Sequence, residues 1–502
     1  MKSGSVIKSL LVSAVMLAVA STADAQSFED FKKQAMSQYN AYKNKVEQDF
    51  KSYRDQVNAE FEEFMRKSWE LKDGNPAKEK PKQEKDVPPV VAPVKDDNQI
   101  EDKQIPNVKV APVPEPEPVP EPIVPIQEVK TPKAVWMDVN LYGTSCKVRF
   151  DKSSDRVFLS GVSENAVADM WSSLSGEKYD NLIADCLKIR NELALCDWAY
   201  MKLVNAVADQ VYGSSNVKES VVLNSYLLTQ SGFKIMMARS TDNSRLHMLF
   251  AADSDIFGHP YWKVNGEHYY LMDGSGAKSL YIFGEEFPKA KAMRLAMTGE
   301  NRFAVKASTP RALKSKRYPD MTASVAVNEN LLSFYNDYPS SFEKGDRYTK
   351  WRAYAMVPID KLTRDRLYPS LRNHIAGKSE EEAVNMILNF VQTAFVYGYD
   401  DEIWGGDRAF FSEETLFYPF CDCEDRSVLF SRLIRDLVGL DVVLLYYPGH
   451  LATAVGFNED VAGDYLMVNG KKYVVCDPTY INARVGMTMP KMDNSSAIAV
   501  TL

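Results

Sequence analysis

The sequence predicts an α+β protein in which helices pack on antiparallel sheets, and three observations lead to this expectation. Residues 369–502 show helical periodicity first and then a run of strand-like segments. Residues 134–274 repeat that order in a weaker form. A long helical repeat and a proline-rich stretch come before both. We therefore expect a duplicated core, with an N-terminal helix and a linker in front of it.

The composition is that of a globular protein with an acidic balance. The chain has 502 residues and a formal net charge of -8 at pH 7. It shows no cluster of Lys and Arg, on which binding to nucleic acid depends. Six cysteines are too few for a disulfide scaffold in so long a chain, and their spacing matches no zinc motif. We expect no nucleic-acid partner, no metal and no cofactor.

Residues 1–25 have the features of a secretory signal peptide. A Lys-bearing start precedes an apolar run from Leu10 to Ala20, and Ala23-Asp24-Ala25 matches the small-residue pattern of a cleavage site. No later apolar run is long enough to span a bilayer. We expect an exported protein, periplasmic or secreted, without a membrane span.

Residues 26–72 follow an eleven-residue repeat that predicts a long amphipathic helix. Its apolar spacings of three, four and four average about 3.67 residues per turn, which favours a right-handed supercoil. This stripe packs either on the body of the protein or on a second helix in a coiled coil, and its regularity favours self-association into a homo-oligomer. The aromatic residues of the stripe are Phe28, Phe31, Tyr39, Tyr42, Phe50, Tyr53, Phe61 and Phe64.

Residues 73–133 have the composition of a disordered linker. They contain no aromatic residue and include the run VAPVPEPEPVPEPIVP. Alternating prolines remove backbone donors and favour the polyproline conformation. We expect a solvated, semi-rigid spacer between the helix and the body.

The C-terminal domain, residues 369–502, has the clearest pattern. SEEEAVNMILNFVQTAFVYG predicts one amphipathic helix, and a second is expected from Cys423 to Val438, with Gly439 as its left-handed cap. Strands are expected at DVVLLYY and LATAVGF, and then a hairpin at YLMVNGKKYVVCD. Asn469-Gly470 suits a type I′ turn in that hairpin.

Residues 134–274 contain a faint copy of this order. SVVLNSYLLTQSGFKIMMA parallels SVLFSRLIRDLVGLDVVLL, and YWKVNGEHYYLMD parallels the later hairpin. We expect an internal duplication. Between the copies, residues 275–368 show alternating stretches that predict a small β-rich insert.

Three residues of the C-terminal domain suit cysteine-dependent acyl transfer. Cys423 falls in the first turn of its helix, behind an Asp422 cap and beside Asp425, where the helix dipole favours a thiolate. His450 opens a strand and Asp477 closes the next hairpin. A nucleophile, a base and an orienting carboxylate would thus meet. Each residue alone has a plainer structural explanation, as core filler, hydrogen-bonder or turn former.

The blocks CEDRSVLFSRLIR, GHLATAV and KKYVVCDPTY together resemble the transglutaminase-like superfamily. The resemblance covers about a fifth of the chain. It implies a papain-like α+β core, with Cys423 as nucleophile, His450 as general base and then acid, and Asp477 as the orienting residue. Members of that superfamily include crosslinkers, peptidases, amide hydrolases and inactive relatives.

The chain departs from that superfamily pattern at several positions. Cys421 stands where a small Gly is common, and Arg426-Ser427 where an aromatic-Ala pair is frequent. The backbone N–H of Cys423 is the physical candidate for an oxyanion donor, with Gln392 or Trp404 as alternatives. Cys421 is expected to be a packed residue, with a regulatory disulfide to Cys476 as a second alternative.

The earlier copy lacks the thiol. Asn216 aligns with Cys423 and Asp273 with Asp477, whereas His247 lies only near the position of His450. We expect this copy to be a non-catalytic module that packs or presents substrate.

The sequence therefore predicts an exported amide hydrolase, peptidase or transglutaminase-like enzyme acting on a protein or peptide, such as a cell-wall peptide. One alternative is a catalytically silent scaffold or binding protein of the cell envelope. Another is an assembly protein in which the N-terminal helix matters most.

Overall fold

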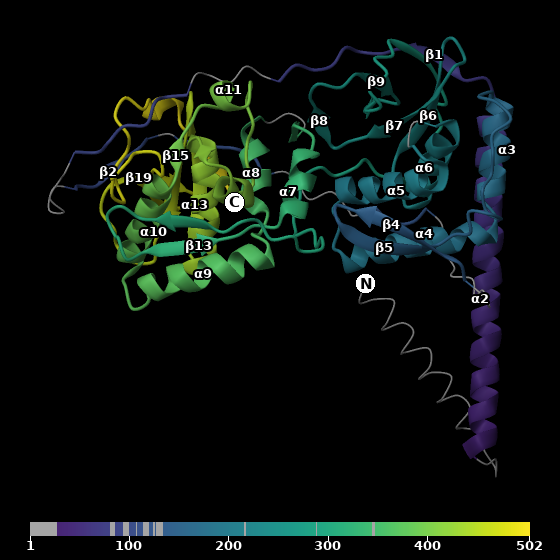
Figure 1. Ribbon diagram of the computed structural model, residues 1–502, viewed down its shortest axis with the longest axis horizontal. Helices are drawn as coiled ribbons and strands as arrows, with labels where there is room; N and C mark the ends of the chain where they lie inside the picture. Colours follow the sequence, from purple (N-terminus) through teal and green to yellow (C-terminus); the bar gives the residue numbers. More distant parts are fainter. Residues whose placement is uncertain are drawn as a thin grey trace.

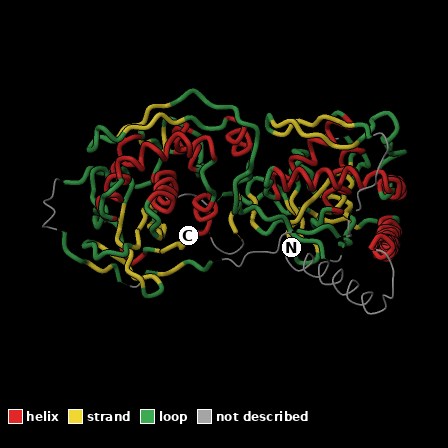
Figure 2. The backbone as a smooth tube through the Cα atoms, turned by 90° about the horizontal axis from the view of Figure 1, so that it is seen from below, coloured by secondary structure: helices red, strands yellow, loops and turns green. Residues whose placement is uncertain are grey.

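The chain folds into two α+β lobes that lie side by side, as a computed structural model shows (Figure 1). This confirms the predicted α+β class. The structure describes residues 28–80, 86–93, 100–106, 108–113, 120–123, 126, 134–214, 217–287, 289–343 and 347–502. The expected signal peptide lies outside these residues. Figure 2 shows that both lobes combine helices with sheet.

The first lobe is built on a six-stranded sheet with the strand order β1-β11-β6-β7-β10-β9. Its strands are β1 (Glu70–Asp73), β6 (Ile235–Ser240), β7 (Leu246–Ala251), β9 (Tyr261–Val264), β10 (Glu267–Tyr270) and β11 (Ser279–Ile282). Its helices are α3 (Glu164–Leu174), α4 (Glu177–Glu192), α5 (Asp197–Tyr212) and α6 (Lys218–Gln230), and β4 (Trp136–Leu141) pairs with β5 (Thr144–Arg149). Helix α6 is buried along almost its whole length, so it forms the centre of this lobe.

The second lobe is built on a seven-stranded sheet with the order β2-β19-β20-β18-β17-β21-β3. Its strands are β2 (Lys103–Gln104), β3 (Lys109–Val110), β17 (Asp441–Tyr447), β18 (His450–Gly456), β19 (Asp464–Val468), β20 (Lys471–Cys476) and β21 (Ile498–Thr501). Its helices are α8 (Lys350–Met356), α9 (Lys361–Ile375), α10 (Glu380–Ala394), α11 (Asp400–Ile403), α12 (Ser412–Phe417) and α13 (Cys423–Leu437), with a short parallel pair of β15 (Val396–Tyr397) and β16 (Phe420–Cys421).

The predicted strands and the second predicted helix of this lobe form within about a residue of their expected ends, whereas the first helix, α10, stops at Ala394 because Val396 and Tyr397 form β15. Ser379 and Glu382 make a capping box at the start of α10. Helix α13 ends at Leu437, and Gly439 follows in the left-handed conformation with a φ of 80°. The turn between β19 and β20 has positive φ at Asn469 and Gly470, as a type I′ turn requires.

The two sheets share part of their strand order. In the first, β11-β6-β7-β10-β9 lie next to one another, and in the second β21-β17-β18-β20-β19 follow the same chain order. In each lobe a buried helix immediately precedes the first of these strands, α6 in one and α13 in the other. The β9–β10 turn, at Asn265 and Gly266, also has positive φ at both positions.

Residues 275–368 do not form the separate β-rich insert that the sequence suggested. Strand β11 belongs to the first sheet, whereas α9 starts at Lys361 behind an Asp360 cap and packs against α10 and α13. The remaining elements are β12 (Arg311–Lys314), β13 (Thr322–Val325), α7 (Glu329–Asn336), β14 (Ser341–Glu343) paired with β8 (Ser254–Ile256), and the short η2 (Arg347–Thr349); η3 (Asn494–Ser496) lies near the C-terminus. The segment connects the lobes and completes both of them.

Helix α2 (Phe28–Met65) is shorter than expected at its C-terminal end, because residues 70–73 form β1. Only its last turns contact the body, where Phe61 stacks on Phe287 with ring centroids 3.9 Å apart. Met65 is fully buried in the same place. The rest of α2 projects away from the first lobe (Figure 1).

The described residues of segment 73–133 are bound to both lobes, which corrects the expectation of a solvated spacer (Figure 1). The segment pairs through β1 with β11, through β2 with β19 and through β3 with β21. It then returns to the first lobe, where the Ile123 amide donates to the Gln230 carbonyl. Sheet edges offer unpaired backbone groups, and an extended chain can use them even where prolines interrupt it.

Candidate active site

The helix start that carries Cys423 is held by a reciprocal cap. Asp422 Oδ1 accepts the backbone N–H groups of Glu424 and Asp425 at 3.0 and 3.2 Å, and Asp425 Oδ2 accepts the N–H of Asp422. The cap fixes Cys423 as the first residue of α13, as the sequence predicted.

His450 and Asp477 form a buried pair at the neighbouring strand ends. His450 Nε2 lies 2.8 Å from Asp477 Oδ2, and the Thr479 and Tyr480 amides bind the other Asp477 oxygen. The imidazole stacks on Tyr447. His450 Nδ1 is buried and has no hydrogen-bond partner among the described residues. The pair thus orients the ring and leaves Nδ1 available.

Helix α13 packs on β17 and β18 and brings Cys423 beside this pair. Ser427 Oγ donates to the carbonyl of Leu451, the residue after His450, and Cys423 shares an apolar cluster with Leu451. The exposed fractions of Cys423, His450 and Asp477 are 1%, 3% and 1%. The structure therefore pairs His450 with Asp477 and places Cys423 next to Leu451, and all three side chains are buried.

The closed site disfavours the thiolate form of Cys423. Burial raises the pKa of Cys423 well above its usual value, and the acids Asp422, Asp86 and Glu424 raise it further. The Leu451 backbone amide opposes the rise. The sequence suggested that the helix N-terminus lowers this pKa, but desolvation and the neighbouring carboxylates outweigh the helix dipole here.

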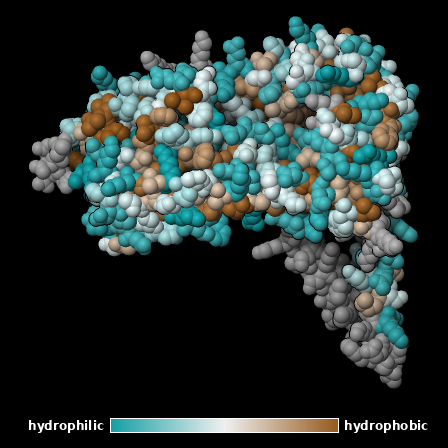
Figure 3. Space-filling view, viewed as in Figure 1, coloured by the Kyte–Doolittle hydropathy of each residue, from teal (hydrophilic) through white to brown (hydrophobic). Residues whose placement is uncertain are grey.

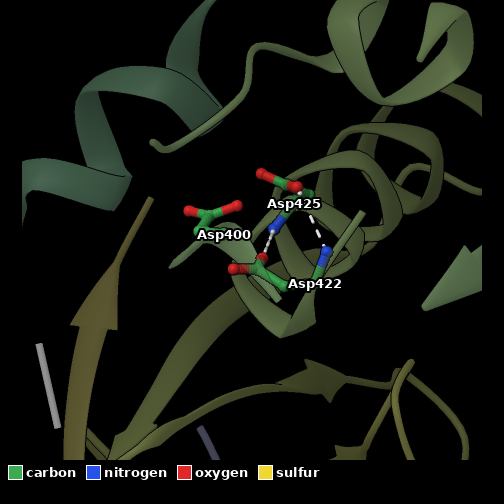
Figure 4. A group of neighbouring side chains, drawn as sticks. All are labelled: Asp400, Asp422 and Asp425. Atoms are coloured by element: carbon green, nitrogen blue, oxygen red, sulfur yellow. Dashed lines mark hydrogen bonds between the residues drawn. The ribbon is translucent and has the colours of Figure 1, made fainter. Parts of the chain in front are cut away.

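Three buried carboxylates converge next to the helix start (Figure 4). They belong to Asp400, Asp422 and Asp425, and one oxygen of each lies within 4.8 Å of the others. Burial raises the pKa of Asp400 to about 7 and raises those of Asp422 and Asp425 as well. The next acid, Glu424, lies 3.5 Å from Lys350 Nζ.

Carboxylate oxygens are typical ligands of divalent cations, so this cluster is where a metal could bind. However, Asp425 already accepts the Phe410 and Asp422 amides, and Asp400 accepts the Arg408 amide. Asp422 Oδ2 is the buried oxygen of the cluster that has no partner among the described residues. One free oxygen among amide-bound carboxylates fits a shared proton better than an ion that needs six or more ligands.

The two side chains considered from the sequence as oxyanion donors have other contacts. Gln392 Nε2 donates to the carbonyls of Asp477 and Tyr480, at 3.0 and 2.8 Å, and its amide therefore braces the loop after β20. Trp404 makes edge-to-face contacts with Phe410 and Tyr418.

Tyr397 is a residue that sequence reasoning missed. Its hydroxyl is buried and has no hydrogen-bond partner among the described residues. Burial, and next the proximity of Cys423 and Asp422, raise its pKa far above the usual value, so it stays a proton donor. Strand β15 places it opposite Cys421 in β16. Only the pairing of two short strands far apart in sequence reveals this position.

All six cysteines are free thiols, so Cys421 and Cys476 are not joined in this structure. Cys421 is buried and its sulfur accepts a hydrogen bond from Arg426 Nε at 3.4 Å. The expectation of a packed residue fits this position.

The first lobe contains a second His–Asp pair, between His247 Nδ1 and Asp273 Oδ2 at 2.5 Å. The strand registers place Asp273 where Asp477 lies, but His247 stands two residues further along its strand than His450 does. Asn216 lies outside the described residues. The pair uses the opposite ring nitrogen from that of His450.

Comparison with family models, with curated proteins and with solved structures found no match to this chain. No helix in the described part of the chain is long and apolar enough to cross a membrane.

Proposed function

We propose that this protein is an exported cysteine-dependent acyl-transfer enzyme, either an amide hydrolase or peptidase or a transglutaminase-like crosslinker. The observation that carries the proposal is the His450–Asp477 pair, which leaves His450 Nδ1 unpartnered beside the helix start that holds Cys423. A nucleophile, a base and an orienting carboxylate on three packed elements suit this chemistry.

In the proposed reaction, His450 Nδ1 removes the proton of Cys423 as Sγ attacks an amide carbonyl. Asp477 stabilises the imidazolium that forms. His450 then gives the proton to the departing amine, which leaves a thioester on Cys423. Water or a second amine attacks that thioester, with His450 again as base, so the thiol is regenerated and a free acid or a new amide is released.

Two donors are placed for the oxyanion of the tetrahedral intermediate. The backbone N–H of Cys423 lies in the first turn of α13, where helices have no internal acceptor. The Tyr397 hydroxyl is the second donor, because it is buried, protonated and unpartnered close to Cys423. We propose Tyr397 in place of Gln392 and Trp404.

The papain-like core and the internal duplication are part of this proposal. A helix-borne cysteine packed on an antiparallel sheet supports the core. The shared strand order of the two lobes and their matching type I′ turns support duplication. The first lobe would then be the non-catalytic copy, with Asp273 retained and His247 displaced.

The burial of the site favours one alternative, a catalytically silent scaffold or binding protein of the cell envelope. The thiol is 1% exposed, and burial and nearby acids raise its pKa. A protein that keeps the fold without the chemistry would look the same in this closed state.

Trapping an acyl adduct distinguishes the two. The protein, incubated with cell-wall peptides or envelope proteins, should gain a thioester-linked mass on the peptide that contains Cys423. Cys423→Ala should gain none, and His450→Asn should gain it far more slowly. The hypothesis of an enzyme is wrong if the parent protein gains no adduct from these substrates or from an activated ester. Export is tested separately by N-terminal sequencing of the mature chain, which should begin at Gln26.

A further inference from the structure

Residues 86–92, named here the strap, run across the candidate active site. The amide of Val87 donates to the carbonyl of Gly449 at 2.9 Å, and Gly449 directly precedes His450. At its other end the strap exchanges two hydrogen bonds with Ile481, through the Ala92 amide and the Val90 carbonyl, each at 2.8 Å. The strap is thus anchored on the two chain segments that carry His450 and Asp477.

The strap also has an apolar seat. Ala92 is buried in a cluster with Tyr480, Ala483 and two methionines, and Val87 packs against the edge of that cluster. Tyr480 and Ala483 belong to the loop after Asp477, which Gln392 holds in place. The seat is therefore an apolar surface on the loop that follows Asp477.

Asp86 places a carboxylate among the groups of the site. The charged groups that act on it are Asp407, His450, Lys350 and Asp401, and it acts in turn on Cys423, Tyr397, Tyr399, Asp400, Asp422 and Glu424. Burial among so many acids is unfavourable for the charged form of Asp86. The strap is held by its backbone and apolar contacts against this repulsion.

We propose that the strap is an internal occupant of the substrate groove, and that the groove takes an extended polypeptide that pairs its backbone with Gly449 and Ile481. This inference extends the proposed function and depends on it, because the groove binds a substrate only if the protein is an enzyme. While the strap is seated, Cys423 and His450 stay almost fully buried, so an acyl donor enters only when the strap leaves.

Alkylation of Cys423 by iodoacetamide in the full-length native protein tests the strap, with the labelled site identified by mass spectrometry. Val87→Pro removes the amide that binds Gly449, and we expect the second-order rate constant to rise about fivefold to tenfold. Val113→Pro is the matched control, since Val113 is exposed, lies in the same proline-rich segment and also stands next to a proline.

Ala92→Pro, which removes one of the two hydrogen bonds to Ile481, serves as a second releasing variant if Val87→Pro does not fold. Equal rates in the parent, the releasing variants and Val113→Pro would overturn the proposal. A synthetic peptide DVPPVVAP should slow labelling of the releasing variant in a saturable way, whereas a scrambled peptide should not. Absence of this protection would overturn the assignment of the groove to an extended polypeptide.

The outcome also separates this proposal from the catalytic one. If release of the strap accelerates labelling but no acyl adduct forms on Cys423, the strap covers the thiol as proposed and the hypothesis of an enzyme is wrong. If an acyl adduct forms equally fast in the parent and in the releasing variants, the hypothesis of an enzyme is supported and the strap proposal is wrong.

Discussion

Single residues of this site act mainly through what they leave unpaired. Arg426, in contrast, is fully paired. It is buried, donates to the carbonyls of Gln392 and Phe395 at the end of α10, and lies over the Tyr397 ring. Cys421, one of the departures noted in the sequence, packs beside its guanidinium. Tyr397 is thereby fixed at its ring while its hydroxyl remains without a partner.

Tyr397→Phe should separate binding of the oxyanion from reactivity of the thiol. We expect acylation of Cys423 by p-nitrophenyl acetate to slow by about a hundredfold, because one donor to the developing oxyanion is lost. Alkylation by iodoacetamide, which forms no oxyanion, should change by less than about twofold. Tyr399→Phe, a neighbouring and more exposed tyrosine, is the control. Equal loss in both assays would assign Tyr397 a packing role instead.

Asp400→Asn should stabilise the protein more at pH 8 than at pH 5. The pKa of Asp400 is raised to about 7, whereas an unfolded Asp titrates near about 4. The folded state therefore binds more protons than the unfolded state between these values, and stability falls as the pH rises through that window. Asparagine keeps an acceptor for the Arg408 amide and carries no charge.

Urea titrations at the two pH values measure this effect as a difference in the free energy of unfolding. Asp401→Asn is the control, because Asp401 is exposed on the same short helix. A gain for Asp400→Asn that is equal at both pH values would contradict the explanation by burial of the carboxyl.

At the scale of elements, α10 holds the loop after β20 in place. Gln392 is 1% exposed and reaches from α10 to the loop after β20, where its oxygen also accepts the Asn482 amide. Asn385 Oδ1 adds a bond to the Val485 amide. One helix face thus positions both Asp477 and the seat of the strap.

Gln392→Ala should lower the free energy of unfolding by about 3 kcal/mol, since buried carbonyls lose their donor. The same variant should release the strap and increase the alkylation rate of Cys423. Urea denaturation and iodoacetamide labelling measure the two effects. Gln210→Ala, at an exposed helical position, should change neither. Unchanged stability of Gln392→Ala would show that the loop after β20 does not depend on Gln392 for its conformation.

At the scale of the whole molecule, α2 has two different parts. Phe61 and Met65 are buried against the first lobe, whereas Tyr39 and Tyr42 are 51% and 58% exposed on the same stripe. The space-filling view shows α2 standing clear of the body (Figure 3). The end of α2 therefore packs on the body, and the remainder leaves Tyr39 and Tyr42 exposed. Self-association through this exposed part of the stripe stays a prediction.

Deleting residues 28–54 should convert a self-associated protein to a monomer with little change in melting temperature, because the deletion spares Phe61, Met65 and β1. Sedimentation velocity and thermal unfolding measure the two effects. Tyr39→Glu with Tyr42→Glu should have the same effect on mass, and Val305→Glu, at an exposed site on the body, should have none. A monomeric parent protein would refute self-association.

Much of the second lobe could be predicted from local signals. The Asp422 cap, Gly439 and Asn469-Gly470 each require a particular backbone conformation, so they fix where elements begin and end. From the order of Cys423, His450 and Asp477 on these elements, the sequence then predicted that their three side chains lie together. The path of residues 73–133 could not be predicted, because edge pairing uses backbone groups that every residue except proline carries. The raised pKa of Cys423 could not be predicted either, since it depends first on burial and also on Asp86, which reaches the site only through the tertiary fold.

The same proline-rich segment closes the open edges of both sheets. Residues 70–75 pair with β11 at one edge of the first sheet and with Tyr261 of β9 at the other. Residues 103–110 cover β19 and β21, the two edges of the second sheet. Unprotected edges recruit strands from other chains. We therefore expect a protease that removes this segment to expose backbone groups at the sheet edges, which could then pair with strands of other copies of the chain.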